Sequence, residues 1–297
     1  PSLHASGFII SDLPLYNYAP LQYSDNGEII VQITKDEFED FGLLKIDCLG
    51  LRFLSVIYDT VKKLYPSIRY PYRFLGQIPL EDEPALRMLA DGDGTGIFQL
   101  ESGGIRDLLK GVKIRKFKDI FEVLALYRPG PLEGRMIPKY LVNRNASSYK
   151  SVFDDDPIRE ILKDTYGIII FQEQVMQIAE KVAGFTLGQA EILRKAMGKR
   201  IPELMKNERE RFVTGAVERG YDKDKANRIF DTLVNFSGYG FNKAHSVGYG
   251  YIAYWCAYFK QHHSAEYYTA LLNAFIDFGA FIQTYIFYIQ RKGIEFL

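Results

Sequence analysis

The chain lacks most features of secreted or membrane-spanning proteins. Its 297 residues include only two cysteines, Cys48 and Cys256, which lie far apart and form no CxxC motif. A structural disulfide is therefore not expected, and a reducing compartment is the natural environment. No uninterrupted apolar run reaches about 18 residues, so we expect no membrane span. The sequence starts at Pro1 without an initiator Met or a signal peptide, and we interpret it as a piece of a longer polypeptide.

An excess of charge of either sign is also absent, since 37 basic residues balance 37 acidic ones. Any contact with nucleic acid must therefore come from local patches. One candidate patch comprises Lys110, Lys113, Arg115, Lys116 and Lys118. The other is expected as a basic helix from Arg194 to Arg211. Most basic runs of this kind are solvated helix faces, so that interpretation stays open for both.

Common metal and nucleophile motifs are missing too. The four histidines do not combine with the cysteines at the spacing of a zinc site. The segment from Asp91 to Gly96 resembles the start of a calcium loop, but Ser102 stands where the bidentate Glu is required. We therefore predict a turn there. No Ser-His-Asp or Cys-His arrangement can be argued from spacing.

A strand-like run from Leu43 to Leu51 carries the most informative polar pair. Alternation places Leu44, Ile46 and Cys48 on one face of the strand, and Lys45 and Asp47 together on the other. One carboxylate for a divalent metal and one lysine for phosphate would suit a site that handles nucleotides. The alternative is a half-buried edge strand with a surface salt bridge.

The order of apolar patterns along the chain predicts an α+β protein. Residues 1–51 are β-rich, with apolar runs at Gly7–Ile10 and Glu28–Ile33 separated by a turn-prone segment. Beyond Gly50 the spacing is helical. A clear amphipathic helix spans Gln172–Val182, and the apolar run Gly248–Phe259 predicts a buried helix.

Three later segments could contact a ligand. In the first, Arg128 stands next to a rigid Pro-Gly-Pro turn, which suits phosphate recognition or a turn with a salt bridge. In the second, the apolar run 166–171 leads into a helix that starts with Gln172, Glu173 and Gln174. In the third, residues 238–246 combine glycines, aromatics, a lysine and a histidine, as close approach to a nucleotide requires.

Together and in this order, these segments resemble the alpha subunit of bacterial DNA polymerase III, a family C replicative polymerase. The resemblance covers essentially the whole chain. The matching motifs are His4–Gly7, Leu44–Leu51, Gly96–Ser102, Ala125–Pro131, Thr165–Met176, Leu193–Lys199 and Gly238–His245.

The resemblance implies a fold and a domain organisation. Residues 1–51 would be the C-terminal part of the palm, a small β-rich edge of a nucleotidyltransferase-like sheet. Residues 52–265 would form a large, mainly α-helical fingers domain. Residues 266–297 would begin the following domain, which in this family leads toward the sliding clamp.

The resemblance also implies the chemistry. Family members add dNTPs to a primer 3′-hydroxyl under template direction, by phosphoryl transfer with two Mg²⁺ ions. Asp47 matches a metal-binding carboxylate of the palm, and Lys45 matches a neighbouring lysine that contacts phosphate. The paired aspartates that complete the metal site should lie upstream of Pro1. We therefore expect this fragment to be inactive alone.

Further residues are assigned to the fingers by the same resemblance. Candidates for binding the nucleotide are Arg128, Lys243, Tyr239, Phe241 and His245. Candidates for binding DNA are Arg194, Lys195, Lys199 and Arg200. His245 could equally be a structural histidine that is fixed by hydrogen bonds.

Two departures from the family pattern bear on these expectations. Ile46 and Cys48 stand where the family usually has Phe, on the strand face expected to be buried. The acidic run Asp154–Asp156 puts nucleic-acid contact by its loop in doubt.

The partners that the resemblance implies are primer-template DNA, dNTPs, the rest of the polymerase subunit, the sliding clamp and other replisome subunits. The implied location is the bacterial cytoplasm, at the nucleoid. The alternative hypothesis is a non-catalytic nucleic-acid-binding module derived from such a polymerase, which the zero net charge and the acidic run favour.

Overall fold

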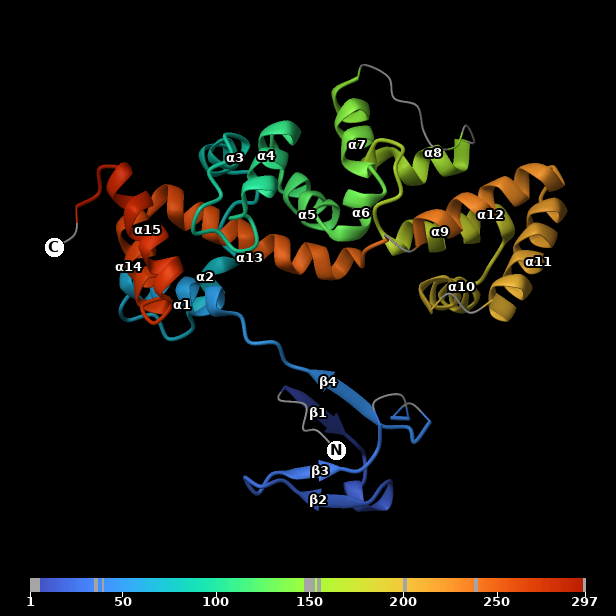
Figure 1. The fold of residues 1–297 in the computed structure, drawn as a ribbon, viewed down its shortest axis with the longest axis horizontal. Helices are drawn as coiled ribbons and strands as arrows, with labels where there is room; N and C mark the ends of the chain where they lie inside the picture. Colours follow the sequence, from blue (N-terminus) through green and yellow to red (C-terminus); the bar gives the residue numbers. More distant parts are fainter. Residues whose placement is uncertain are drawn as a thin grey trace. The chain divides into compact units, whose positions relative to one another are not determined.

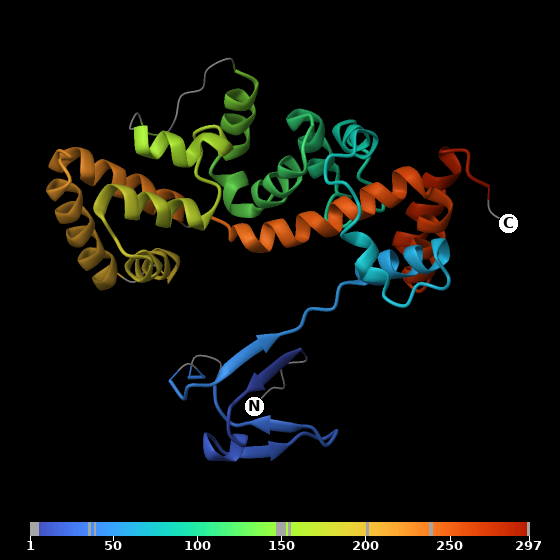
Figure 2. The same ribbon diagram turned by 180° about the vertical axis from the view of Figure 1, so that it is seen from behind.

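The computed structural model describes residues 6–34, 37, 38, 40–146, 153, 156–199, 202–237 and 240–295. The chain divides into two compact units, Pro1–Arg52 and Phe53–Leu297 (Figures 1 and 2). The first unit is β-rich and the second is helical, so the predicted α+β class with a mainly helical body is confirmed. Among the described residues, no helix combines the length and apolar character needed to cross a membrane.

The first unit contains two small antiparallel sheets. Strand β1 (Gly7–Ile10) pairs with β4 (Leu44–Asp47), and β2 (Leu21–Tyr23) pairs with β3 (Ile29–Val31). A short 3₁₀ helix, η1, spans Leu15–Asn17. The predicted turn between β2 and β3 is present: Ser24 N–H donates to the Glu28 carbonyl, and Gly27 adopts a φ of 84°. A positive φ is the conformation for which glycine is suited.

The apolar face of β4 is not buried, contrary to the sequence expectation. Leu44, Ile46 and Cys48 are all exposed in the structure. The register pairs Leu44 with Ile10 and Ile46 with Phe8, and those β1 side chains are exposed as well. A two-stranded sheet has too few strands to form a covered core of its own, which explains the exposure.

The second unit is built from helices joined by short connections. The first half contains α1 (Arg52–Leu64), α2 (Pro71–Leu75), α3 (Glu83–Ala90), α4 (Gly103–Val112), α5 (Phe117–Leu126), α6 (Pro129–Glu133) and α7 (Met136–Asn145). The second half contains α8 (Asp156–Leu162), η2 (Lys163–Thr165), α9 (Gln172–Ala183), α10 (Leu187–Lys199), α11 (Pro202–Glu218), α12 (Lys223–Ser237), α13 (Lys243–His262), α14 (Ser264–Ala274) and α15 (Gly279–Arg291).

Helix α13 is the predicted buried helix and runs between α5 and α3. Its side chains Ala253, Cys256 and Phe259 are fully buried. Gly250 lies against Phe121 of α5, so closely that an added Cβ would stand 2.9 Å from the Phe121 Cβ. The glycine thus allows the two helices to approach each other.

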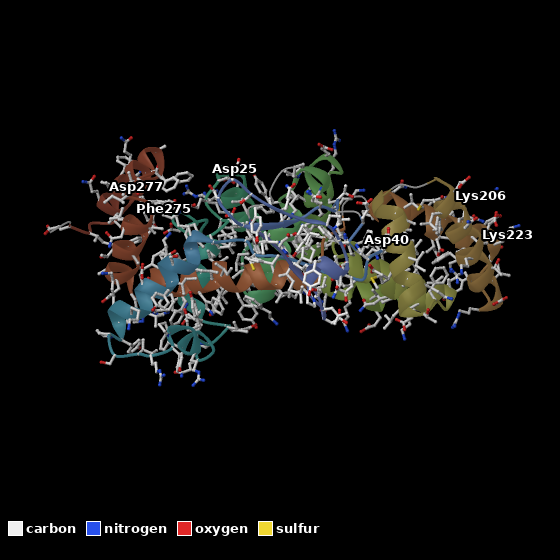
Figure 3. All side chains as sticks on the ribbon, turned by 90° about the horizontal axis from the view of Figure 1, so that it is seen from below. Asp25, Asp40, Lys206, Lys223, Phe275 and Asp277 are labelled. Atoms are coloured by element: carbon white, nitrogen blue, oxygen red, sulfur yellow. The ribbon has the colours of Figure 1, made fainter. Side chains whose placement is uncertain are left out.

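Helices α8 to α12 share a separate hydrophobic core within the helical unit. The apolar stripe predicted for α9, comprising Val175, Ile178, Ala179 and Val182, is buried in it. Lys206 of α11 and Lys223 of α12 lie at the end of the helical unit opposite Phe275 and Asp277, which connect α14 to α15 (Figure 3). The site residues of this unit lie where α9 and α13 begin.

Candidate functional site

Lys45 and Asp47 share one face of β4, as strand alternation predicted. The ammonium of Lys45 lies 2.8 Å from Oδ1 and 3.0 Å from Oδ2 of Asp47. The Asp47 side chain is exposed and that of Lys45 is partly exposed. The surface salt bridge of the alternative interpretation is therefore present, and the pair is also open to a ligand from solvent.

The chemistry of the Asp47 side chain suits a single ligand of a magnesium ion. A carboxylate is the ligand that Mg²⁺ prefers. Within the described part of the chain, no group of three or more His, Cys, Asp or Glu side chains is arranged to hold a metal ion. Asp47 thus offers one oxygen ligand, without a cluster of further ligands among the described residues.

In the helical unit, a parallel β-bridge joins two predicted segments that are far apart in sequence. Phe171 pairs with Phe241: the N–H of Phe241 donates to the Ile170 carbonyl, and the N–H of Gln172 donates to the Phe241 carbonyl, both at 2.9 Å. Helices α9 and α13 start directly after this bridge, so their N-termini lie side by side (Figures 1 and 2).

Arg128, Phe241 and His245 are brought into one cluster. The guanidinium carbon of Arg128 lies 3.4 Å from the ring centroid of Phe241. The Phe241 ring meets His245 edge-on at 5.3 Å, and His245 stacks on Tyr249 at 4.2 Å. The imidazole of His245 is thus held by ring contacts. Among the described residues no hydrogen bond to that ring is found, so the expected alternative of a hydrogen-bonded structural histidine gains no support.

Arg128 has no acidic partner in the described part of the chain, so the alternative of a turn with a salt bridge gains no support there. Its Nε donates to the Leu124 carbonyl at 3.3 Å, and the side chain is half-buried. Burial lowers the pKa of its guanidinium, because desolvation disfavours the charged form. A desolvated cation without a carboxylate favours an anionic ligand.

Lys243 begins α13 and is linked to α9 through Glu173. The Lys243 backbone N–H donates to both carboxylate oxygens of Glu173, each at 3.0 Å, and Asn242 Nδ2 donates to Oε1 at 3.2 Å. Asn242 Oδ1 accepts from the His245 N–H at 2.7 Å and caps the helix. The Lys243 ammonium lies 5.7 Å from the Phe171 ring centroid.

Arg194 lies next to this cluster but is already paired. Its Nε donates to Glu191 at 2.7 Å, which raises its pKa, and one Nη donates to Gln172 at 3.3 Å. Lys195 is exposed. The Lys199 side chain and all of Arg200 and Tyr239 lie outside the described residues, as do Asp154 and Asp155.

The basic run from Arg194 to Arg211 does not form a single helix. Helix α10 ends at Lys199 and α11 begins at Pro202. Proline at the start of a helix is well tolerated, whereas inside one it breaks the hydrogen-bond ladder. Arg209 pairs with Asp231 of α12 and Arg211 with Glu208, so part of the basic charge is neutralised within the protein.

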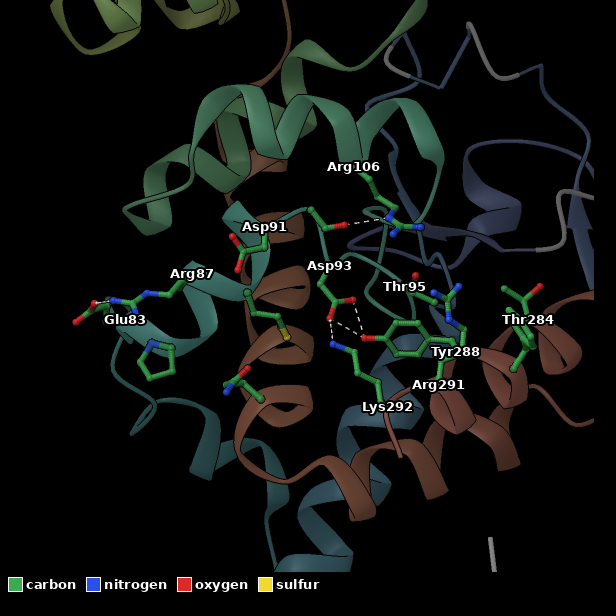
Figure 4. A pocket seen from close by; sticks show the side chains of 15 residues that line it. Glu83, Arg87, Asp91, Asp93, Thr95, Arg106, Thr284, Tyr288, Arg291 and Lys292 are labelled. Carbon is green, nitrogen blue, oxygen red and sulfur yellow. Dashed lines mark hydrogen bonds and ion pairs between the residues drawn. The ribbon is translucent and has the colours of Figure 1, made fainter. Parts of the chain in front are cut away.

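A polar cluster that sequence reasoning missed lies at a cavity of about 1150 Å³ between α3, α4, α13 and α15. Asp93 accepts a hydrogen bond from Tyr288 at 2.6 Å and pairs with Lys292 at 2.8 Å (Figure 4). It also pairs with Lys260 of α13 at 2.8 Å. Burial raises the pKa of the Asp93 carboxyl group, but the neighbouring lysines lower it more, so that the pKa is about 2. The segment from Asp91 to Gly96, which resembles the start of a calcium loop, is a turn, as predicted. The carboxylate of Asp93 in this turn pairs with lysines.

Glu173 is a further residue of the site to which the sequence analysis gave no role. A second cavity, of about 410 Å³, lies beside the Arg128 cluster and is lined in part by Glu173, Lys243, Phe171 and the buried Glu122. The only sequence signal was the run of three polar residues at the start of α9. Its partner at the start of α13 is 70 residues away.

Two protein-family models match the chain, and the boundary between the residues that they match coincides with the boundary between the two units. The bacterial DNA polymerase III alpha subunit finger domain matches residues 53–220. The bacterial DNA polymerase III alpha NTPase domain matches residues 1–50.

Curated relatives support the same assignment. The DNA polymerase III subunit alpha of Halalkalibacterium halodurans is 40% identical over 296 residues, which is 100% of this chain and 26% of that protein. The Aquifex aeolicus protein of the same name is 41% identical over 272 residues, or 92% of this chain and 23% of the relative. A Staphylococcus aureus relative is 42% identical over 296 residues, covering 100% of this chain and 27% of its own length. This chain thus spans about a quarter of the length of these relatives, and it belongs to the family of the bacterial DNA polymerase III alpha subunit.

Proposed function

We propose that this chain is the palm-edge and fingers portion of a DNA-directed DNA polymerase. The whole protein would add dNTPs to a primer 3′-hydroxyl under the direction of a template, with phosphoryl transfer at two metal ions. Family membership supports this proposal. Residues 1–51 would contribute the palm edge, 52–265 the fingers, and 266–297 the start of the domain that follows.

The observation that carries the proposal is the half-buried Arg128, which lies on Phe241 without an acidic partner in the described part of the chain. An arginine held in this way presents its remaining N–H groups in a fixed fork, which matches phosphate oxygens. Arg128 and Lys243 would bind the triphosphate of the incoming dNTP. Phe241, His245 and Tyr239 would pack on its sugar or base.

The β-rich unit would supply one ligand to the metal site. Asp47 would donate a carboxylate oxygen to Mg²⁺, and Lys45 would turn from Asp47 toward phosphate. When bound, Mg²⁺ neutralises charge that develops on the transferring group. Because the other carboxylates would come from outside the chain, we expect no polymerase activity from this fragment alone.

The remaining assignments rest on the family alone. Arg194, Lys195, Lys199 and Arg200 would contact DNA. The partners would be primer-template DNA, the rest of the polymerase subunit, the sliding clamp and other replisome subunits, in the cytoplasm at the nucleoid. The second candidate, a non-catalytic nucleic-acid-binding module, is favoured by the Lys45–Asp47 ion pair, since a pair that satisfies itself needs no metal.

A substitution at Arg128 in the full-length polymerase tests the proposal. Arg128→Gln should raise the KM for dNTP by roughly tenfold to a hundredfold, the effect of losing a charged hydrogen bond, while primer-template affinity stays unchanged. Arg159→Gln, at an exposed arginine of α8, is the matched control. If both variants extend primers with wild-type kinetics, Arg128 does not bind the nucleotide.

A further inference from the structure

Four exposed tyrosines lie close together in sequence at the junction of α1 and α2. Tyr58 lies in α1, and Tyr65 directly follows that helix. Tyr70 and Tyr72 lie at the start of α2. Their exposed fractions are 38%, 43%, 50% and 54%, in that order. Single exposed rings are common on protein surfaces, but several that gather in one patch can mark an interaction site.

The rings of α1 are exposed because of the helical period. The helix buries Phe53, Val56, Ile57, Thr60 and Val61 against the helical unit. Tyr58, Lys62 and Tyr65 are spaced by four and three residues, which places them together on the outer side. On α2, Pro71 and Leu75 are buried, which leaves Tyr72 and Arg73 outside.

Contacts hold this surface in a defined arrangement. The rings of Tyr58 and Tyr72 lie 5.8 Å apart and connect α1 to α2. The guanidinium groups of Arg69 and Arg73 both lie over the Tyr70 ring, at 5.2 and 4.8 Å from its centroid. The Lys62 ammonium donates to the Pro66 and Ile68 carbonyls, at 3.0 and 3.2 Å, and fixes the intervening loop.

The charge of this segment is strongly biased. Residues 58–73 contain four basic side chains, Lys62, Lys63, Arg69 and Arg73, and one acidic side chain, Asp59. Among the described residues, no carboxylate pairs with Arg69 or Arg73. In contrast, the three arginines of α10 and α11 each form an ion pair with a carboxylate: Arg194 with Glu191, Arg209 with Asp231 and Arg211 with Glu208.

We propose that this tyrosine–arginine surface, formed by Tyr58, Tyr65, Arg69, Tyr70, Tyr72 and Arg73, binds single-stranded nucleic acid. Sites for single strands combine aromatic rings on which bases stack with cations that follow the phosphates. Arginines that are already stacked on tyrosine lose little freedom on binding and offer a second kind of platform for bases. An acidic peptide would use the cations and leave four exposed rings without a function.

The proposal goes beyond the nucleotide site, because it concerns a different part of the helical unit and needs neither dNTP nor metal. In a polymerase, the natural occupant would be the unpaired template strand, and that identification rests on the proposed function. Binding of a single strand is measured without primer extension. Failure here would therefore leave the assignment of Arg128 untouched, and failure of that assignment would leave this surface untouched.

The test is fluorescence anisotropy of a labelled oligothymidylate titrated with the whole chain, at several salt concentrations. Tyr70→Leu combined with Tyr72→Leu should weaken binding by about tenfold or more, since each stacked base contributes substantially to affinity. The salt dependence should not change. The matched control is Tyr16→Leu with Tyr23→Leu, at two exposed tyrosines of the other unit.

A second pair of variants separates stacking from charge. Arg69→Gln with Arg73→Gln should lower the slope of log affinity against log salt by about 1.4, because each phosphate contact contributes about 0.7 for single strands. The control is Lys163→Gln with Lys223→Gln. Circular dichroism and thermal unfolding should match the wild type for all variants.

Three results would overturn the proposal. The first is wild-type affinity for oligothymidylate in the tyrosine variant. The second is a loss of affinity in the tyrosine variant that is as large for duplex DNA as for the single strand, since paired bases hide their faces. The third is displacement of the oligonucleotide by polyglutamate at equal charge, which would assign the surface to an acidic protein.

Discussion

The guanidinium of Arg128 and the ring of Phe241 form a stacked pair, with 3.4 Å between the guanidinium carbon and the ring centroid. Phe241 is itself fixed by the β-bridge to Phe171 and by its contact with His245. Three segments that are distant in sequence therefore define the direction of one cation. Preorganisation of this kind reduces the entropy lost when a phosphate binds.

A first prediction concerns the ring that supports Arg128. In the full-length polymerase, Phe241→Leu should keep the charge but release the guanidinium, and so raise the KM for dNTP by roughly fivefold, the scale of one cation–π contact. Steady-state single-nucleotide incorporation measures this effect. Phe281→Leu, at an exposed ring of α15, is the control. Equal KM values for the two variants would contradict a positioning role of Phe241.

A second prediction concerns the metal ligand. Asp47→Asn in the full-length polymerase should reduce primer extension on the order of a thousandfold or more, because a neutral amide holds Mg²⁺ poorly. DNA affinity should remain. Asp25→Asn and Asp40→Asn serve as controls at other acidic positions of the same unit (Figure 3). An extension rate that matches these controls would remove Asp47 from the metal site.

A third prediction concerns the buried ion pair between α13 and the turn before α4. Asp93→Asn removes the carboxylate that faces the buried Lys260, and it should lower the free energy of unfolding by about 3 kcal/mol. Asp91→Asn is a matched control, since that side chain is exposed two residues earlier. Urea unfolding measures both variants. Equal stabilities would mean that the backbone carbonyls alone satisfy Lys260.

Much of the local structure was predictable from the sequence. The apolar stripe of α9, the buried run of α13 and the turn at Gly27 each follow from a periodicity or a residue preference. The common face of Lys45 and Asp47 follows from strand alternation in the same way. Such features depend on neighbours within a few residues.

The features that complete the site depend on distant residues and could not be predicted. Glu173 accepts from the N–H of Lys243, and Lys260 donates to Asp93 across 167 positions. No spacing rule connects such residues. The burial of the β4 face was predicted wrongly for a related reason. Alternation tells which side chains share a face, but only the packing of other elements decides whether that face is covered.

A fourth prediction tests a close approach between α9 and α11. A Cβ on Gly215 would overlap the carbonyl oxygen of Ala183, which belongs to the backbone and cannot turn away. Gly215→Ala should therefore destabilise the protein by about 2 kcal/mol, as overpacking does. Gly198→Ala in α10 meets nothing within 4 Å, and it should stabilise by about 0.5–1 kcal/mol. Thermal unfolding should move in opposite directions for the two variants, and shifts of the same sign would contradict this packing.

The last prediction concerns the carboxyl group of Glu122, which is buried in α5. Burial raises its pKa to about 7, against the opposing effects of the Lys118 ammonium at 3.5 Å and the Tyr140 hydroxyl, which donates to it. The folded chain thus holds a proton that the unfolded chain releases near its ordinary pKa of 4.5. The contribution of Glu122 to the free energy of unfolding is therefore fully present below about pH 4.5. It is lost as the pH rises to about 7, and the loss is at most about 3 kcal/mol.

Glu122→Gln should remove this dependence, because the amide cannot ionise and still accepts from Tyr140. We expect the stability of the wild type relative to this variant to fall between about pH 5 and about pH 8, as measured by urea unfolding. Glu160→Gln, at an exposed carboxylate of α8, should differ from the wild type by the same amount at both pH values. A wild-type curve that runs parallel to that of Glu122→Gln would show that Glu122 ionises normally. The Lys118 ammonium and the Tyr140 hydroxyl would then offset the cost of its burial.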